Sequence, residues 1–221
     1  MSVAARGERT DHGPMRNRLR TPLIAASVAA AALAVGAPSA SAGILVASAP
    51  NCTTPVTTQA FRSVDGDTDA YQLVPGGNFE AGAQSWSLKG GAATVSGNEP
   101  WKASGGGVRS LRLPPGASAT SPVMCVGLEH PTARLFTNDN RGLLSTLAVS
   151  VIFETSLGLK ASAPIGVILP GGKWKPSPKL LVLANLLPLL PGSKTPVQFQ
   201  VTSVGLGTWW VDDFFVDPKC R

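Results

Sequence analysis

The sequence predicts an all-β protein, an antiparallel β-sandwich or jelly roll, and three observations support this fold class. The 24 Gly and 19 Pro among 221 residues would interrupt most long helices. Several short segments alternate apolar and polar residues, as strands with one buried face do. Clusters of Gly and Pro separate these segments at short intervals, which is typical of the turns in such folds.

The composition excludes other classes of protein. Hydrophobic residues make up 43% of the chain and charged residues 14%, which is too apolar for a disordered chain. The Gly-x-y repeat of collagen is absent, and three Cys are too few for a disulfide-rich scaffold. A loop-rich globular β protein remains.

The first 42 residues have the pattern of a secretory signal peptide. Three closely spaced Arg precede an apolar run at residues 23–35, and residues 40–42 supply the small side chains that a signal peptidase recognises. The apolar run is shorter than the roughly 20 residues of a membrane-spanning helix. Translation is hypothesised to start at Met15, because Glu8 and Asp11 are acids that signal peptides avoid. We therefore expect a secreted protein, extracellular or associated with the cell wall.

The rest of the chain is predicted to hold an N-terminal arm over residues 43–70, which contains Cys52, and one jelly-roll domain over residues 71–221. Without residues 1–42 the chain keeps 14 basic and 11 acidic side chains, a net charge of +3. No dense basic stripe remains, so a nucleic-acid partner is not expected. A transmembrane segment is not expected in the mature chain.

The three cysteines all follow the predicted signal peptide. An oxidising compartment allows two of Cys52, Cys125 and Cys220 to pair, and three pairings are possible. The pairing of Cys52 with Cys125 is favoured, because Cys220 is the penultimate residue and is expected at a frayed end. Metal binding by these cysteines is not expected, since no C-x-x-C spacing is present.

Ten segments are predicted to be strands. Residues 197–202 alternate apolar and polar side chains, and residues 147–154 have the pattern of a more deeply buried strand. The apolar run at residues 180–190 is interrupted by Pro188 and is predicted to be a core-facing strand or a turn of helix, with a membrane contact as the alternative. The other predicted strands are residues 71–74, 85–89, 92–95, 108–113, 121–126, 133–138, 165–169 and 208–216.

No catalytic motif is recognisable. His130 is the one histidine after the predicted signal peptide, and no G-x-S-x-G elbow accompanies it. It is interpreted as a loop residue that bonds to the backbone. A glycosidase needs two facing carboxylates, and no spacing in the sequence nominates such a pair. The sequence therefore predicts a protein that is not an enzyme, with a hydrolase of unrecognised site as the third alternative.

Two segments carry a resemblance to a known family. Residues 74–80, with the sequence VPGGNFE, are followed by Trp86 and resemble the opening of secreted carbohydrate-binding modules that have the galactose-binding-like jelly-roll fold. Residues 208–216, with the sequence TWWVDDFFV, resemble the last strand of these modules. Phrases within residues 111–132 resemble a group of secreted actinobacterial proteins. Together these segments frame residues 71–217, and they imply the fold more specifically than a ligand.

The resemblance implies a structural calcium ion near the ends of the domain. Glu80 and Asp212 become candidate ligands, and Asn78 or nearby carbonyl groups would complete an oxygen shell.

Asp212 has a second interpretation. Strand alternation places it on the face of Trp210 and Phe214. In the alternative to metal binding, Asp212 caps backbone amides or pairs with a basic side chain such as Arg109 or Arg112.

Sugar binding requires exposed aromatic rings that stack on the sugar. Trp86 stands where the family buries a core residue, and alternation also places one of Trp209 and Trp210 in the core. Trp101 and Trp174 are therefore the candidate binding residues.

Both candidates lie in loops rich in Gly or Pro, with lysines beside them. Lys102 follows Trp101, and Lys173 and Lys175 flank Trp174, which favours an anionic ligand. We predict a module that binds a carbohydrate or a cell-envelope polymer. The alternatives are that each Trp covers one end of the sandwich, and that the chain is a structural or protein-interaction domain without a small ligand.

Overall fold

The structure is a computed structural model that describes residues 56–127, 132–140, 142, 144–155, 157–182 and 195–217. The chain divides into two units, Met1–Ala40 and Ser41–Arg221, and every described residue belongs to the second. The predicted signal peptide, His130, most of the apolar run at 180–190, and two of the three cysteines lie outside the described residues. The pairing of Cys52 with Cys125 therefore stays a prediction. No described helix has the length and hydropathy of a membrane span.

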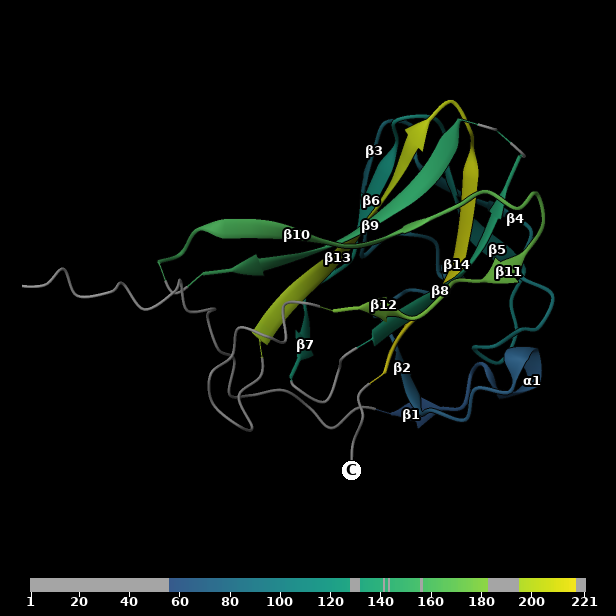
Figure 1. Ribbon diagram of the computed structural model, residues 1–221, viewed down its shortest axis with the longest axis horizontal. Helices are drawn as coiled ribbons and strands as arrows, with labels where there is room; N and C mark the ends of the chain where they lie inside the picture. Colours follow the sequence, from purple (N-terminus) through teal and green to yellow (C-terminus); the bar gives the residue numbers. More distant parts are fainter. Residues whose placement is uncertain are drawn as a thin grey trace, which may run out of the picture. The chain divides into compact units, whose positions relative to one another are not determined.

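The described part of the second unit is a sandwich of two antiparallel sheets (Figure 1). The predicted antiparallel β-sandwich of jelly-roll type is thereby confirmed. The eight-stranded sheet contains β1 (Thr57–Thr58), β2 (Tyr71–Leu73), β4 (Ala93–Ser96), β5 (Arg109–Leu113), β8 (Thr132–Asp139), β11 (Lys175–Pro176), β12 (Leu180–Leu181) and β14 (Trp209–Asp217). The six-stranded sheet contains β3 (Ser87–Lys89), β6 (Ser118–Thr120), β7 (Met124–Val126), β9 (Ser145–Glu154), β10 (Lys160–Ile168) and β13 (Thr195–Gly205).

One long strand organises each sheet. In the eight-stranded sheet, β14 pairs with β8 along one edge and with β5 and then β2 along the other. In the six-stranded sheet, β13 pairs with β9 along one edge and with β6 and β7 along the other. The element that follows β1 is a single short helix, α1 (Arg62–Asp65).

The main hydrophobic core contains the inward side chains of both sheets. In β13, buried and half-buried residues alternate from Thr195 to Ser203, so Val197, Phe199 and Val201 all enter the core. Trp86 is 5% exposed, and its indole N–H donates to the carbonyl of Pro75 at 3.0 Å. Its predicted burial is therefore confirmed.

A second cluster of buried aromatic residues, here called the outer cluster, lies on the opposite face of the eight-stranded sheet. Its members are Ala60, Phe61, Tyr71, Phe136 and Phe215. Phe61 comes from the segment before α1 and stacks on Phe136 of β8, with ring centroids 5.1 Å apart. The N-terminal segment therefore covers this face of the sheet, which would otherwise expose aromatic rings to water.

A β-bulge interrupts the alternation of β14. Trp209 and Val211 enter the main core and Trp210 is half-buried, as alternation requires. The register with β8 then shifts between Asp212 and Phe215, and Asp213 adopts a φ of 45°. The extra residue places Phe214 in the main core and Phe215 in the outer cluster. The expectation that strand alternation continues from Trp210 through Asp212 to Phe214 is therefore wrong.

Several predicted boundaries also differ from the structure. The strand expected at residues 121–126 is confined to β7, and β6 precedes it as a separate strand. The strand expected at 165–169 belongs to β10, which begins five residues earlier at Lys160. Pro164 lies within β10, beside a shift in register. A proline cannot donate a hydrogen bond to the neighbouring strand, so its presence in the sequence argues against a strand at this position.

Candidate functional site

The candidate site is built on residues 97–108, here called the tryptophan loop, which connect β4 to β5. The loop closes on itself, because the amide of Gly97 donates to the carbonyl of Val108 at 2.8 Å. The carboxylate of Glu99 accepts hydrogen bonds from the amides of Trp101 and Ala103, at 2.5 and 2.6 Å. Glu99 is 1% exposed, so the turn that carries Trp101 is fixed from the inside.

Two further carboxylates hold the same loop against the sheet. Asp213, on the bulge of β14, accepts a hydrogen bond from the amide of Ser104 at 2.8 Å. Glu80 accepts hydrogen bonds from the amides of Val108 at 3.0 Å and Arg109 at 2.8 Å. The loop is thus anchored at its start, middle and end by acidic side chains that accept backbone amides.

The two predicted tryptophans lie against the same outer cluster. Trp101 is 36% exposed, and its ring centroid lies 5.4 Å from that of Phe136 at an interplanar angle of 31°. Trp174, which directly precedes β11, is partly buried against the outer cluster. Each ring has one side on the protein, as the lid interpretation expects, and Trp101 also keeps a surface in solvent.

The predicted lysines differ in their exposure to solvent and in their hydrogen bonds. Lys173 is exposed. Lys175 is half-buried, and its ammonium group donates to the carbonyl of Leu169 at 2.9 Å. Lys102, the neighbour of Trp101, is exposed and adopts a φ of 54°. Lys102 and Lys173 are therefore the better placed of these cations to meet a ligand.

Beneath the tryptophan loop, the structure gathers acidic groups that the sequence did not connect. Glu99, Asp212 and Asp213 are each at most 1% exposed. Burial, reinforced by the charge of Asp213, raises the pKa of Asp212 to about 8. Burial also raises the pKa values of Glu99 and Asp213, and the nearby Glu80 charge adds to the effect on Asp213. Buried carboxylates without a cation are costly as anions.

The predicted calcium ligands reach this region from two directions. Glu80 bonds to the end of the tryptophan loop, and Asp212 accepts the amides of Glu99 at 3.2 Å and Asp213 at 2.9 Å. Asn78 is half-buried in the turn before Glu80. The oxygen donors suit calcium in type. Within the described ranges, however, no group of three or more His, Cys, Asp or Glu side chains is arranged to hold a metal ion.

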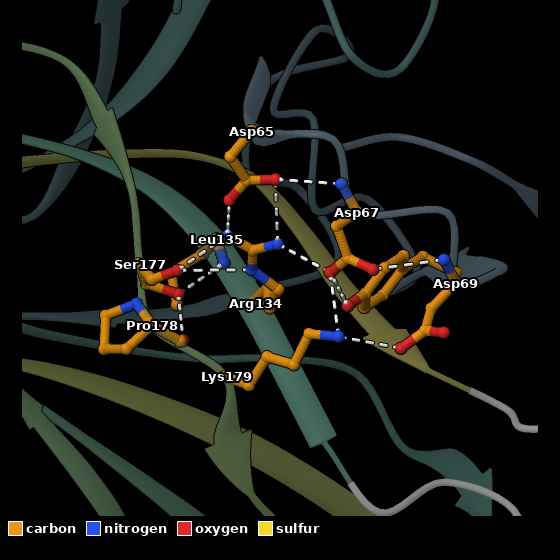
Figure 2. Close-up of polar contacts among 9 residues, drawn as sticks. Asp65, Asp67, Asp69, Arg134, Leu135, Ser177, Pro178 and Lys179 are labelled. Atoms are coloured by element: carbon orange, nitrogen blue, oxygen red, sulfur yellow. Dashed lines mark hydrogen bonds and ion pairs between the residues drawn. The ribbon is translucent and has the colours of Figure 1, made fainter. Parts of the chain in front are cut away.

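The N-terminal segment is fastened by a second polar network, here called the arm clasp, which Figure 2 shows. Arg134 of β8 forms ion pairs with Asp65 at 2.5 Å and with Asp67 at 2.7 Å. Lys179 pairs with Asp67 at 3.1 Å and with Asp69 at 2.8 Å. Three alternating aspartates therefore close around two cations from the sandwich.

The centre of the arm clasp, Arg134 with Asp67, is withdrawn from solvent, whereas Asp65, Asp69 and Lys179 keep exposed surface. The side chain of Arg134 is 5% exposed, and its guanidinium lies 4.0 Å from the ring centroid of Phe61. The same guanidinium donates to the carbonyl of Ser177, so β8, the arm and the segment before β12 meet at one side chain. The phenol of Tyr71 donates to Asp67 at 2.6 Å. This geometry is that of a structural fastening.

Neither the carboxylates beneath the tryptophan loop nor the aspartates of the arm clasp form a recognisable catalytic arrangement. Glu99, Asp212 and Asp213 are buried beneath the tryptophan loop and accept or face backbone amides. The aspartates of the arm clasp are paired with Arg134 or Lys179. His130 lies outside the described residues.

Comparison with known proteins finds likeness in fold and none in family. No protein-family model and no curated protein matches the chain. Similar solved structures include a family 61 carbohydrate-binding module in complex with β-1,4-galactotriose, at 18% identity and a TM-score of 0.39, covering 65% of this chain and 96% of that one.

Two other solved structures contain a family 22 carbohydrate-binding module. The N-terminal CBM22-1 and GH10 modules of Clostridium thermocellum xylanase 10B, in complex with xylohexaose, have 16% identity and a TM-score of 0.45, covering 63% of this chain and 27% of that one. The xylan-binding domain of Paenibacillus barcinonensis Xyn10C has 13% identity and a TM-score of 0.43, covering 63% of this chain and 90% of that one. At these values the likeness concerns the β-sandwich fold alone.

Proposed function

We propose that the chain is a secreted, non-catalytic module that binds a carbohydrate or cell-envelope glycan through the tryptophan loop. The observation that carries the proposal is Trp101, which is 36% exposed on a loop held by buried carboxylates. An aromatic ring held in one orientation at the surface offers a flat apolar face for a sugar ring at little entropic cost. Trp174 extends the aromatic surface over the same outer cluster.

The charges around these rings support an acidic ligand. Lys102 and Lys173 are exposed. Each is the direct neighbour of its tryptophan in the sequence, Trp101 or Trp174. Cations beside a stacking surface attract polyanions over distances of about one Debye length. The proposed partner is therefore an anionic polysaccharide or envelope polymer.

The experiment that tests this function is a glycan array probed with the secreted chain. We expect the wild type to bind acidic glycans, and the double variant Trp101→Ala, Trp174→Ala to lose that binding. The Leu157→Ala variant is the matched control, because Leu157 is 74% exposed on the turn between β9 and β10 of the other sheet. Binding by the double variant at the wild-type level contradicts the proposed surface, and no binding by the wild type contradicts the function.

Secretion and the disulfide belong to the same proposal. Signal-peptide removal is supported by the pattern of residues 1–42, and pairing of Cys52 with Cys125 by the expected fraying at Cys220. We expect the secreted product to begin at Gly43, and a non-reduced peptide map to contain a Cys52–Cys125 linkage. A product that begins elsewhere contradicts the predicted cleavage site, and a linkage through Cys220 contradicts the predicted pairing. Neither result bears on the proposed glycan binding.

A structural calcium ion beneath the tryptophan loop is also proposed. Its candidate ligands are those that the resemblance implies, Glu80, Asp212 and Asn78, whose oxygen donors suit calcium in type; no group of three or more His, Cys, Asp or Glu side chains in the described ranges is arranged to hold the ion. Added calcium is expected to raise the melting temperature and a chelator to lower it. A melting temperature that responds to neither removes the ion from the account.

A protein-interaction role is the second candidate, and one observation favours it. Leu144 and Leu206 are 76% and 77% exposed on neighbouring turns, joined by a hydrogen bond from the amide of Leu206 to the carbonyl of Leu144 at 3.2 Å. Adjacent exposed leucines are a common feature of protein interfaces. A chain that binds no glycan on the array but self-associates, with association lost in Leu206→Ala, would favour this candidate.

A further inference from the structure

A groove of about 520 Å³ opens between the tryptophan loop and the N-terminal strand. One wall is the N-terminal strand β1, and the opposite wall is the part of the loop from Lys102 to Gly105. In the sheet beside the groove, β14 pairs with β5 along its first half and with β2 along its second. The bulge at Asp213 lies between these two pairings, and there the backbone of Phe214 bonds to Val74 and Gly77.

The floor of the groove is apolar. Half-buried Leu73 of β2 forms it, backed by its sheet partner Phe215 of β14, which is fully buried, and Ala103 lies at the loop side. Such a floor suits the C–H face of a sugar ring, because their contact removes apolar surface from water.

The rim of the groove is polar and carries one charge. The threonines of β1, Thr57 and Thr58, are exposed there, and Gln72 contributes an amide. Among the described residues that line the groove, Lys102 is the one charged residue and none is acidic. Hydroxyl and amide groups around an apolar floor are the arrangement that fixes the orientation of a polyhydroxylated ligand.

Both walls are held in place without a ligand. The amides of Ala103 and Ser104 are bonded to the buried carboxylates of Glu99 and Asp213. On the other side, Thr57 and Thr58 pair with Gln72 and Tyr71. Binding therefore requires little ordering of the protein, which keeps the cost of association low.

We propose that this groove binds a uronic acid unit of the glycan, with the carboxylate paired to Lys102 and the ring over Leu73. A single ammonium group matches a carboxylate of one negative charge, whereas the two charges of a phosphate monoester are better matched by the fork of an arginine. The proposal rests on the proposed glycan binding and adds to it the chemical class of one sugar unit.

The test compares trigalacturonate with α-1,4-galactotriose, which differ in their carboxylates, by isothermal titration of the full secreted chain. Wild type is expected to bind trigalacturonate about tenfold more tightly than galactotriose, as one charge-assisted hydrogen bond provides. Lys102→Gln is expected to reduce the affinity for trigalacturonate to that for galactotriose. The matched control is Lys89→Gln, which removes an exposed lysine from β3 in the other sheet and should change neither affinity.

A second variant tests the location independently of charge. Thr57→Trp places a large side chain at an exposed position of the rim and is expected to abolish binding of both trisaccharides while leaving the melting temperature unchanged. Equal wild-type affinity for the two trisaccharides, or an unchanged affinity in both groove variants, overturns the groove proposal. If array glycans still bind in that case, the proposed function stands; if the wild type binds neither the array nor either trisaccharide, both fail.

Discussion

Asp212 and Asp213 occupy the middle of β14, at positions that alternation would assign to one buried and one exposed side chain. Both are buried, and the pKa of Asp212 is raised to about 8 from 3.8 by burial and by the charge of Asp213. A group whose pKa is raised in the folded state contributes stability below its unfolded pKa and loses that contribution as the pH rises through its folded pKa. Stability should therefore depend on pH through this residue.

The first prediction concerns that pH dependence. In chelator, the free energy of unfolding is expected to fall by at least about 2 kcal/mol between about pH 4 and about pH 8, because the folded state must give up a proton that it holds more tightly than the unfolded chain. The measurement is urea unfolding at several pH values. Asp212→Asn should flatten the profile, whereas Glu154→Gln, at the exposed end of β9, should leave it unchanged. A wild-type profile as flat as that of Asp212→Asn contradicts the prediction.

Arg134 is the residue on which the arm clasp depends. It pairs with two aspartates, donates to the Ser177 carbonyl and lies over the ring of Phe61. Removing one partner from a buried ion pair leaves the other charge uncompensated, which costs more than the pair itself contributes.

Replacement of Arg134 by Met is therefore expected to destabilise the protein by about 3 kcal/mol, measured by urea unfolding. The free energy of unfolding of Arg134→Lys should lie between those of the wild type and Arg134→Met, because lysine keeps the charge and loses the fork of donors. Arg112→Met serves as the control, since Arg112 is exposed on β5 and its replacement should cost less than about 0.5 kcal/mol. Equal effects of the two Met variants would falsify the structural role of the clasp.

At the scale of elements, the N-terminal segment from β1 to residue 70 behaves as a part that the sandwich holds by the outer cluster and the clasp. Burial works against ionisation of Asp67, but bonds from Tyr71, the Asp69 amide, Lys179 and Arg134 outweigh it and lower the pKa of Asp67 to about 2. A lowered pKa contributes stability above the unfolded value of 3.8, and this contribution is lost as the pH falls toward 2.

Acid should therefore release the arm. We expect cleavage by pepsin next to Phe61 to accelerate between about pH 4 and about pH 2, as protonation of Asp67 weakens the clasp. Rates are to be normalised to those of the denatured chain, which corrects for the activity of the protease itself. A normalised rate that stays constant over this range indicates that the outer cluster alone holds the arm.

The elements also differ in how far the sequence predicts them. Alternation predicts β13 well, because its inward and outward side chains keep a period of two from Thr195 to Ser203. It fails in β14 after Asp212, since two adjacent Asp residues carry no signal of a bulge. It cannot find β1 either: two threonines have no apolar pattern, and the clasp that orders this segment joins Asp67 to Arg134, 67 residues away.

The candidate site is predicted in the same uneven way. The composition of its loop is enough to nominate Trp101, because a tryptophan among Gly and Pro has few ways to be buried. Glu99 and Asp213, which hold that loop, are found only in the structure, since their role depends on amides that the fold brings to them. The sequence nominates Lys175 by its position beside Trp174, whereas its bond to Leu169 depends on the path of the loop.

At the scale of the whole molecule, the two sheets form a frame, and the proposed binding surface lies on the outer face of the eight-stranded sheet. The tryptophan loop, the outer cluster and the described part of the N-terminal arm, residues 56–70, all lie on the eight-stranded sheet. The arm contributes a wall of the groove and covers the aromatic rings that the sheet would otherwise expose. Binding should therefore depend on the arm as well as on Trp101.

The central claim is that Trp101 contacts the glycan, and the most direct test is the NMR signal of its indole N–H during titration with the strongest-binding oligosaccharide of the array. Two buried tryptophans serve as internal controls, because the indole of Trp86 bonds to Pro75 and that of Trp209 to Ser145. The account predicts that the Trp101 signal shifts with saturation while those of Trp86 and Trp209 stay in place. A Trp101 signal that does not move while the oligosaccharide binds would contradict it.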